Sequence, residues 1–333
     1  MSYLLVGDTH FSDRPRDAYR FGIFEWIRKQ QERHNPIATF IMGDVCDRKD
    51  NHSALLVNRI ANELSGLIKP VYILKGNHDY TDPANPYFGF LSHMQGISFI
   101  SNPGLVCGDR VAVIPHCRTE KAFMANCMAF GKIKPSPTLL LCHQTFEGAI
   151  AETGVRLAGY NQSAIDYLRP RLGTYAGDVH RPQRAANVTY VGAPYHIRFG
   201  DEYEPRAILV TNNNMVRNLY FDTIKKWSLT VRDATEITDN DKLGAGDQVK
   251  ITVELAREEA THWSTYKRQV REAATAKGLE VFGLDCKVST NTSDIKITER
   301  QANSPKDTFV EFCKVENVPT AIKEAGACLL SDP

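Results

Sequence analysis

Five short polar motifs follow one another along the first two thirds of this sequence. They read Gly7-Asp8-Thr9-His10, Gly43-Asp44-Val45-Cys46-Asp47, Gly76-Asn77-His78-Asp79, the isolated His143, and Gly177-Asp178-Val179-His180. Each comes at the C-terminal end of a short apolar run, at residues 3–6, 39–42, 71–74, 138–142 and 174–176. Because parallel strands deliver their carboxyl ends to one edge of a sheet, we expect the motifs to converge. The series therefore predicts an α/β fold.

The converging side chains are carboxylates, imidazoles and an amide. This is the chemistry of a two-metal hydrolase site, where two cations hold a phosphate ester and activate a water. Asp44 is the natural bridge between two ions, because it follows the central strand and its carboxylate has two oxygens. Mixed oxygen and imidazole ligands suit Mn²⁺; Fe²⁺ or Zn²⁺ also fit, and Mg²⁺ fits less well.

The motif series resembles the calcineurin-like metallophosphoesterase superfamily over about residues 3–200, and within it the SbcD-like DNA nuclease subunits. The narrower resemblance depends on three short segments: Asp166-Tyr167, His180-Arg181-Pro182-Gln183 and Tyr190-Val191-Gly192-Ala193-Pro194. It implies a two-sheet sandwich flanked by helices, plus a smaller α+β capping domain.

The same resemblance assigns roles to the motif residues. It implies one ion held by Asp8, His10, Asp44 and His180, and a second ion held by Asp44, Asn77, His143 and Asp178. His78 would be a non-ligand that assists the leaving oxygen, and Asp79 would orient the His78 imidazole. The family's final motif is Gly-His-x-His, and Asp178 replaces its first histidine. An aspartate still binds a hard divalent ion through oxygen.

Arginines follow the first and last motifs. Arg14 and Arg181 are candidates for contacts with DNA phosphates, because they stand beside proposed ligands. A solvated surface position is the alternative for both. Arg16 and Arg20 are expected on a helix.

The sequence predicts three segments: a first domain at 1–223, a small α+β domain at 224–303 and a helical pair at 304–333. The resemblance implies that the first is the metallophosphoesterase domain and the second a capping domain that binds DNA. Alternating Val249, Ile251, Val253 and Leu255 predict a half-exposed strand, and residues 257–277 an amphipathic helix. Further strands are expected at 280–288 and 295–298. The resemblance implies that the final pair docks on an SbcC-type coiled-coil ATPase. Packing against its own domain is the alternative.

Local signals predict the remaining elements of the first segment. Residues 17–33 have a helical apolar pattern, Ser53 is positioned to cap a second helix, and Thr119 and Gly131 bound a third. Asn212-Asn213-Asn214 predicts a hairpin turn between strands at 207–211 and 216–221. Strands are also expected at 111–114 and 188–191.

The composition is that of an ordinary globular protein of 333 residues, with a net charge of +1 that does not by itself indicate nucleic-acid binding. No apolar run approaches the length of about 20 residues that spans a membrane, so a cytoplasmic location is expected. The eight cysteines include no Cys-x-x-Cys pair and are expected to be reduced.

These observations favour a Mn²⁺-dependent DNA exonuclease and endonuclease subunit. The resemblance implies that it acts with an SbcC-type ATPase in DNA recombination or double-strand break repair; a homodimer is left open. No Gly-x-x-x-x-Gly-Lys-[Ser/Thr] sequence is present, so ATP use would belong to the partner. Two alternatives stand: a phosphomonoesterase such as a protein phosphatase, which Asp47-Arg48 favours, and a non-catalytic subunit that binds DNA ends.

Overall fold

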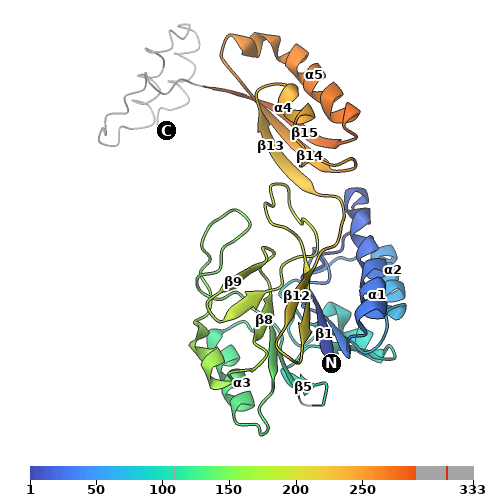
Figure 1. Ribbon diagram of the computed structural model, residues 1–333, viewed down its shortest axis with the longest axis vertical. Coiled ribbons are helices and arrows are strands. Elements are labelled where there is room, and N and C mark those ends of the chain that lie inside the picture. The colour runs from blue at the N-terminus through green and yellow to red at the C-terminus, as the bar shows by residue number, and fades with distance from the viewer. Residues whose placement is uncertain (109, 290–312, 314–333) are drawn as a thin grey trace, which may run out of the picture. The chain divides into compact units, whose positions relative to one another are not determined.

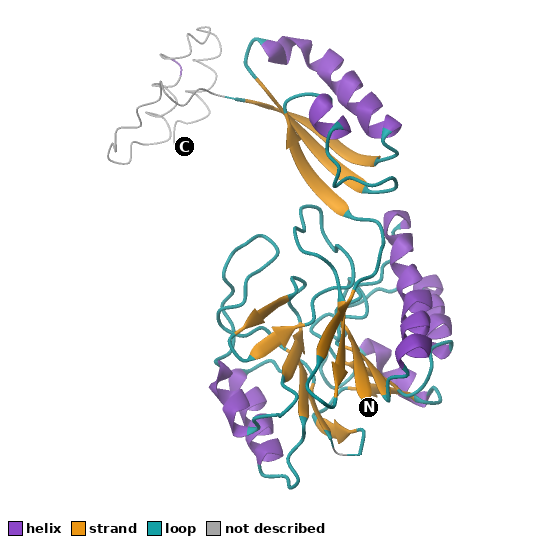
Figure 2. Ribbon diagram, in the orientation of Figure 1, coloured by secondary structure: helices purple, strands orange, loops and turns teal. Residues whose placement is uncertain are grey.

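The computed structural model describes residues 1–108, 110–289 and 313, and Met1–Lys287 form one compact unit. Two six-stranded mixed sheets pack together in the N-terminal part of this unit, with helices on their outer sides (Figures 1 and 2). The expected α/β sandwich is thus confirmed. The domain boundaries at 223 and 303 stay predictions.

The first sheet has the strand order β12-β11-β1-β2-β3-β4. Strands β1 to β4 run parallel, as the predicted strand–helix alternation requires, whereas β11 and β12 are antiparallel additions. The hairpin predicted at Asn212-Asn213-Asn214 joins these last two strands. The strands are β1 (Ser2–Val6), β2 (Ala38–Ile41), β3 (Val71–Leu74), β4 (Ile97–Ile100), β11 (Ala207–Thr211) and β12 (Val216–Leu219).

The second sheet has the order β5-β6-β7-β8-β10-β9. Its four central strands are parallel, and the short strands β5 and β9 pair antiparallel at the two edges. The strands are β5 (Gly104–Val106), β6 (Val111–Ile114), β7 (Leu139–His143), β8 (Thr174–Gly177), β9 (Gln183–Ala185) and β10 (Val188–Tyr190).

The alternation of side chains along β1 divides the core into layers. Tyr3 and Leu5 point between the sheets and join a buried cluster with residues of the second sheet, such as Val113 and Leu141. Leu4 and Val6 belong to a different cluster on the outer face. Both faces of β1 are therefore buried, which explains its uninterrupted apolar sequence.

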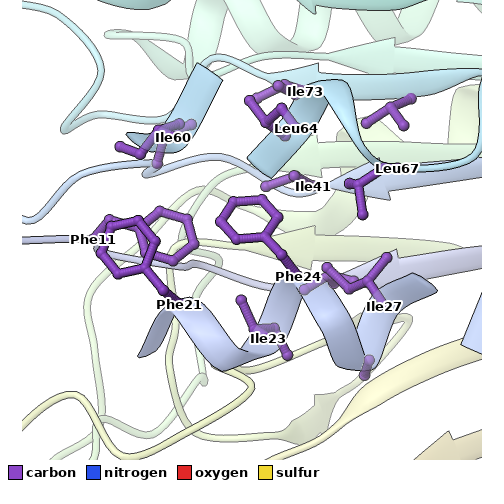
Figure 3. Close-up of a cluster of buried hydrophobic side chains, with 14 of the residues drawn as sticks. Phe11, Phe21, Ile23, Phe24, Ile27, Ile41, Ile60, Leu64, Leu67 and Ile73 are labelled. Carbon is purple, nitrogen blue, oxygen red and sulfur yellow. The ribbon is translucent and has the colours of Figure 1, made fainter. Parts of the chain in front are cut away.

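Helices α1 (Gly22–His34) and α2 (Ala54–Ser65) cover the outer face of the first sheet. Figure 3 shows Phe24 and Ile27 from α1 meeting Ile60 and Leu64 from α2 over the sheet residue Ile41. Burying each such side chain stabilises the fold by roughly 1.5–3 kcal/mol. Helix α3 (Glu120–Gly131) covers the second sheet in the same way, through Phe123 and Phe130.

The predicted caps are confirmed. The Ser53 hydroxyl accepts a hydrogen bond from the Leu56 amide, and the Thr119 hydroxyl accepts one from Ala122. The helix expected at 17–33 instead begins as the 3₁₀ helix η1 (Pro15–Phe21) before α1. In η1 the side chains of Asp17 and Arg20 are buried and form an ion pair.

A third sheet of order β13-β14-β15 follows, with β13 (Lys226–Val231), β14 (Gln248–Leu255) and β15 (Glu280–Val288). The alternation predicted from Val249 to Leu255 is confirmed, since all four side chains are buried against Val270 and Ala274 of α5 (Trp263–Ala276). The remaining helices are η2 (Tyr87–His93), η3 (Gln162–Tyr167), α4 (Thr235–Thr238) and η4 (Glu259–His262).

Two expectations lie outside the described residues: the strand at 295–298 and the helical pair at 304–333. The cysteines among the described residues are free, as expected. No helix among these residues is long and apolar enough to cross a membrane.

Candidate metal centre

The strand ends of both sheets meet at one cluster of polar side chains. Strands β1, β2 and β3 supply residues from the first sheet, and β7 and β8 supply residues from the second. Three groups of ligand atoms each lie within 4.8 Å of one another: Asp8, His10 and His180; His10, Asp44 and His78; and Asp44, His143 and Asp178. The convergence expected from the motif order is therefore present.

The first group joins the two ends of the motif series. Nε2 of His10 lies 2.9 Å from Nε2 of His180 and 3.6 Å from Oδ2 of Asp44. Asp8 is fully buried beside them. Two imidazole nitrogens and two carboxylates thus face a common point, which is a donor set that divalent transition metals accept.

The group of Asp44, His143 and Asp178 lies on the other side of Asp44. Nδ1 of His143 donates a hydrogen bond to the Met42 carbonyl at 2.7 Å. Because a neutral imidazole has one N–H group, Nε2 of the neutral ring is then unprotonated. This Nε2 lies 3.4 Å from Oδ1 of Asp44 and 3.7 Å from Oδ1 of Asp178. Asp44 therefore turns one oxygen toward each group, the geometry that a bridging carboxylate needs.

Electrostatics at the cluster fit bound cations. Burial raises the pKa of Asp8 to about 7, and the Asp44 and Asp178 carboxylates act in the same direction. Oδ1 of Asp8 and Oδ1 of Asn77 are buried without a hydrogen-bond donor among the described residues. Divalent ions between these oxygens would both neutralise the crowded carboxylates and satisfy the two atoms.

The backbone is held in an uncommon conformation at three of these residues. The φ angles of His10, Asp44 and Asp178 are 42°, 50° and 81°, in the left-handed region that favours glycine. Space is equally restricted at Gly76, where an added Cβ would lie 2.1 Å from Oδ1 of Asp44. Tight turns directly after the strands therefore aim the proposed ligands at one point.

His78 and Asp79 occupy the cluster in a way that corrects one expectation. Nδ1 of His78 donates to the Asp47 carbonyl at 2.7 Å, so the Asp47 backbone, not the Asp79 carboxylate, orients this imidazole. Asp79 is fully buried and accepts hydrogen bonds from the amides of Asp44, Val45 and Gly76. Its carboxylate thus ties the loop of the Gly43–Asp47 motif to the start of its own motif.

Glu152 is a site residue that the sequence did not reveal. Its Oε1 lies 3.1 Å from Nδ1 of His180 and accepts a hydrogen bond from the His180 amide at 3.2 Å. Burial alone would raise the pKa of Glu152, but the hydrogen bond with His180 lowers it to about 2. The residue lies in a loop after β7 with no metal motif, so no local pattern indicates this contact.

Arg16 and Arg20 lie on the 3₁₀ helix η1, and the phosphate contacts expected of Arg14 and Arg181 stay predictions. The Arg14 guanidinium is paired with the carboxylates of Asp17 and Asp47. Arg20 is buried and donates to the His10 carbonyl. Arg181 is half-buried directly after His180, and no ion pair of its side chain is found in the part of the chain that the structure describes.

A cavity of about 470 Å³ opens beside the cluster. The imidazoles of His10, His78 and His180 line one part of it. The other lining residues are Arg14, Arg16, Asp17, Asp47, Ile197, Arg198, Phe199, Lys226 and Lys250. Five of these nine side chains are basic, so the cavity suits an anionic ligand larger than a single phosphate.

The chain is similar to several known proteins. Residues 1–143 match the protein family described as calcineurin-like phosphoesterase. The chain is also 24% identical over 240 residues to exonuclease subunit 1 of enterobacteria phage T4, covering 68% of this chain and 69% of that protein. A solved structure described as a novel archaeal phosphodiesterase aligns with a TM-score of 0.38 and 11% identity, over 66% of this chain and 100% of that chain. The family match spans the first four of the five motifs.

Proposed function

We propose, from the calcineurin-like metallophosphoesterase domain that this chain carries, that the protein is a two-metal-dependent DNA nuclease subunit. The observation that carries the proposal is the position of Asp44, whose two oxygens face His10 and His143 on opposite sides. The similarity to a phage exonuclease subunit supports a nucleic acid as the substrate. The basic cavity beside the cluster supports a polyanionic substrate over a small phosphomonoester.

In this proposal Asp8, His10, Asp44 and His180 hold one ion, and Asp44, Asn77, His143 and Asp178 hold the other. Bound divalent cations supply charge neutralisation at phosphorus and a more acidic water. Mn²⁺ suits the mixed oxygen and nitrogen donors best. Asp44, with His143 beside it, keeps the two proposed ion positions close together. Glu152 orients the His180 imidazole, and the Met42 carbonyl orients the His143 imidazole.

His78 is the proposed acid for the leaving oxygen. Because a carbonyl can only accept, the hydrogen bond to Asp47 keeps a proton on Nδ1 of His78. Nε2 can then donate only when the ring is doubly protonated, and an imidazolium is a suitable acid near neutral pH. The ring lies beside His10, with 5.0 Å between centroids, and lines the cavity.

The proposed partner is an SbcC-type coiled-coil ATPase, and the proposed role is DNA recombination or double-strand break repair. Two observations support a partner: the T4 relative is named a subunit, and this sequence has no P-loop motif of its own. Residues 304–333 remain the proposed docking segment. Residues 224–303 are proposed as the capping domain.

One assay tests the proposed activity. Purified protein with Mn²⁺ is given labelled single-stranded DNA, double-stranded DNA and, in parallel, a phosphoserine peptide. Cleavage of DNA without release of phosphate from the peptide is the expected result, and the Asp44→Asn variant serves as the inactive control. Hydrolysis of the peptide alone would identify a phosphomonoesterase. Binding of DNA without any hydrolysis would identify a non-catalytic subunit.

A further inference from the structure

The cavity beside the metal centre contains an aromatic ring that the proposed hydrolysis does not use. Phe199 lies in the loop between β10 and β11, is only partly buried, and lines the same cavity as His10, His78 and His180. We propose that Phe199 is a stacking platform for one base of an unpaired nucleic-acid strand whose scissile phosphate lies at the metal centre. This inference rests on the proposed nuclease function and specifies the form of its substrate.

The surroundings of Phe199 are aromatic and cationic. The Phe282 ring lies 5.7 Å away between centroids, at an interplanar angle of 48°, and Phe282 is 39% exposed. Nζ of Lys250 lies 5.0 Å from the centre of the Phe199 ring, and Nζ of Lys226 lies 5.9 Å from it. Within the described residues Phe199 belongs to none of the buried hydrophobic clusters. Core packing therefore does not account for the ring.

The charges along the cavity are not all neutralised. The two acidic residues, Asp17 and Asp47, are already paired with Arg14 and Lys226. Arg16, Arg198 and Lys250 are exposed, and none has a carboxylate within 4.0 Å among the residues that the structure describes. Three unpaired cations next to an aromatic ring match a sugar–phosphate backbone that carries a base at the ring.

The geometry favours an unpaired strand as the occupant. A base can lie on a side-chain ring only when it is not stacked and paired inside a duplex. Lysines near such a ring can contact the phosphates on either side of the stacked base. A phosphorylated peptide could bind the cations of this cavity, but it would not explain why the Phe199 ring is partly exposed there.

Binding assays without turnover test the inference. Fluorescence anisotropy with excess EDTA is measured for a labelled single-stranded oligodeoxynucleotide, for the same length of abasic sugar–phosphate chain, and for a duplex. Wild-type protein should bind the base-containing strand about tenfold more tightly than the abasic chain, since one stacked base contributes roughly 5- to 100-fold. The Phe199→Ala variant should bind both single strands with nearly equal affinity, and Phe199→Trp should restore the preference.

Two matched variants separate stacking from charge and from folding. Lys250→Gln should weaken binding of both single strands equally and reduce the slope of log affinity against log salt by about 1. Tyr167→Ala removes an aromatic side chain that is 54% exposed outside the cavity, and it should leave the preference unchanged. Circular dichroism melting curves check that all variants are folded.

The outcomes also distinguish this inference from the proposed function. A wild-type preference for bases that persists in Phe199→Ala would overturn the platform alone. Equal losses for strand, abasic chain and duplex in Phe199→Ala would assign Phe199 a structural role and overturn it as well. No detectable binding of either single strand by wild-type protein in EDTA would overturn the platform, whereas no cleavage of any polynucleotide in the Mn²⁺ assay would contradict the nuclease function itself.

Discussion

The carboxylate of Glu152 lies 3.1 Å from Nδ1 of His180, on the side of the ring opposite to the nitrogen that faces His10. A ring proton on Nδ1, toward this carboxylate, would leave Nε2 of His180 with its lone pair toward the cluster. A loop outside the motifs thus sets the orientation of a proposed metal ligand.

Glu152→Gln keeps the size of this side chain and removes its charge, whereas Glu152→Ala removes the contact. We expect the affinity for Mn²⁺ to fall by about 10- to 100-fold in Glu152→Ala and by less in Glu152→Gln. Isothermal titration with Mn²⁺ measures both. Equal affinities in wild type and Glu152→Ala would mean that His180 is held by other contacts.

Asp44→Ala tests the bridge. Because Asp44 faces both groups, we expect loss of both metal ions and of hydrolysis in a protein that remains folded. Elemental analysis after gel filtration gives the metal content, and the exposed Asp241→Ala is the matched control. Retention of two ions per chain in Asp44→Ala would exclude the bridging role.

His78→Ala separates chemistry from metal binding. The imidazole is held by the Asp47 carbonyl and is proposed to donate a proton, so we expect the rate to fall by about 10²–10⁴. Metal content and DNA affinity should stay at wild-type values. If the metal content falls together with the rate, His78 is a ligand, as its closeness to His10 and Asp44 also permits.

Asp178→His tests the unusual residue of the last motif. Oδ2 of Asp178 accepts a hydrogen bond from the Thr145 hydroxyl at 2.5 Å, and Oδ1 faces His143. An anionic oxygen favours hard ions, so the variant should keep activity and shift its ranking of metals from Mn²⁺ toward Zn²⁺. Activity measured with each metal in turn gives the ranking. An unchanged order would show that Asp178 does not contact the ion.

Asp17→Asn tests the buried ion pair between Asp17 and Lys226, whose Nζ lies 2.6 Å from Oδ1. Burial alone would raise the pKa of Asp17, but the Arg20 charge and the Lys226 hydrogen bond lower it to about 2. This depressed pKa corresponds to about 2 kcal/mol of folding stability above pH 4. We expect Asn to cost at least this much at pH 7, because two buried cations lose their partner.

The pH dependence of that difference gives a second check. Since the Asp17 pKa is depressed, its contribution is lost as the pH falls from about 4 through about 2. Urea unfolding of metal-free wild type and Asp17→Asn over this range should show the two stabilities converging. The other titrating groups are common to both proteins and cancel in the comparison. A difference independent of pH would contradict the ion-pair explanation.

The parallel strands of the two six-stranded sheets other than β4, and the positions of the proposed ligands, could be predicted because their signals are local. Each strand from β1 to β3 is an apolar run that ends at a glycine-containing motif. The hydrogen-bonded cap Ser53 marks the helix between β2 and β3, and Thr119 marks the helix between β6 and β7. Pattern and topology agree at every one of these positions. The order of the motifs then determines which side chains meet.

Other features depend on contacts between distant residues and were not predicted. Strands β5 and β9 have three residues each, and they are strands because they pair with β6 and β10. Strand β13 begins with Lys226, a residue that is buried only because Asp17 neutralises it. Glu152 and Phe199 lie in loops, where periodicity carries no information about which groups they face.

The left-handed backbone at His10, Asp44 and Asp178 lowers the stability of the fold at the same positions whose side chains are proposed to bind metal. Left-handed conformations cost non-glycine residues about 1–2 kcal/mol each, and glycine avoids that cost. Directed evolution for heat resistance alone, carried out without divalent ions, would therefore enrich glycine at positions whose side chains are proposed to bind metal. Selection for thermostability in such an enzyme has to be coupled to selection for turnover, or it will produce a robust and inert fold.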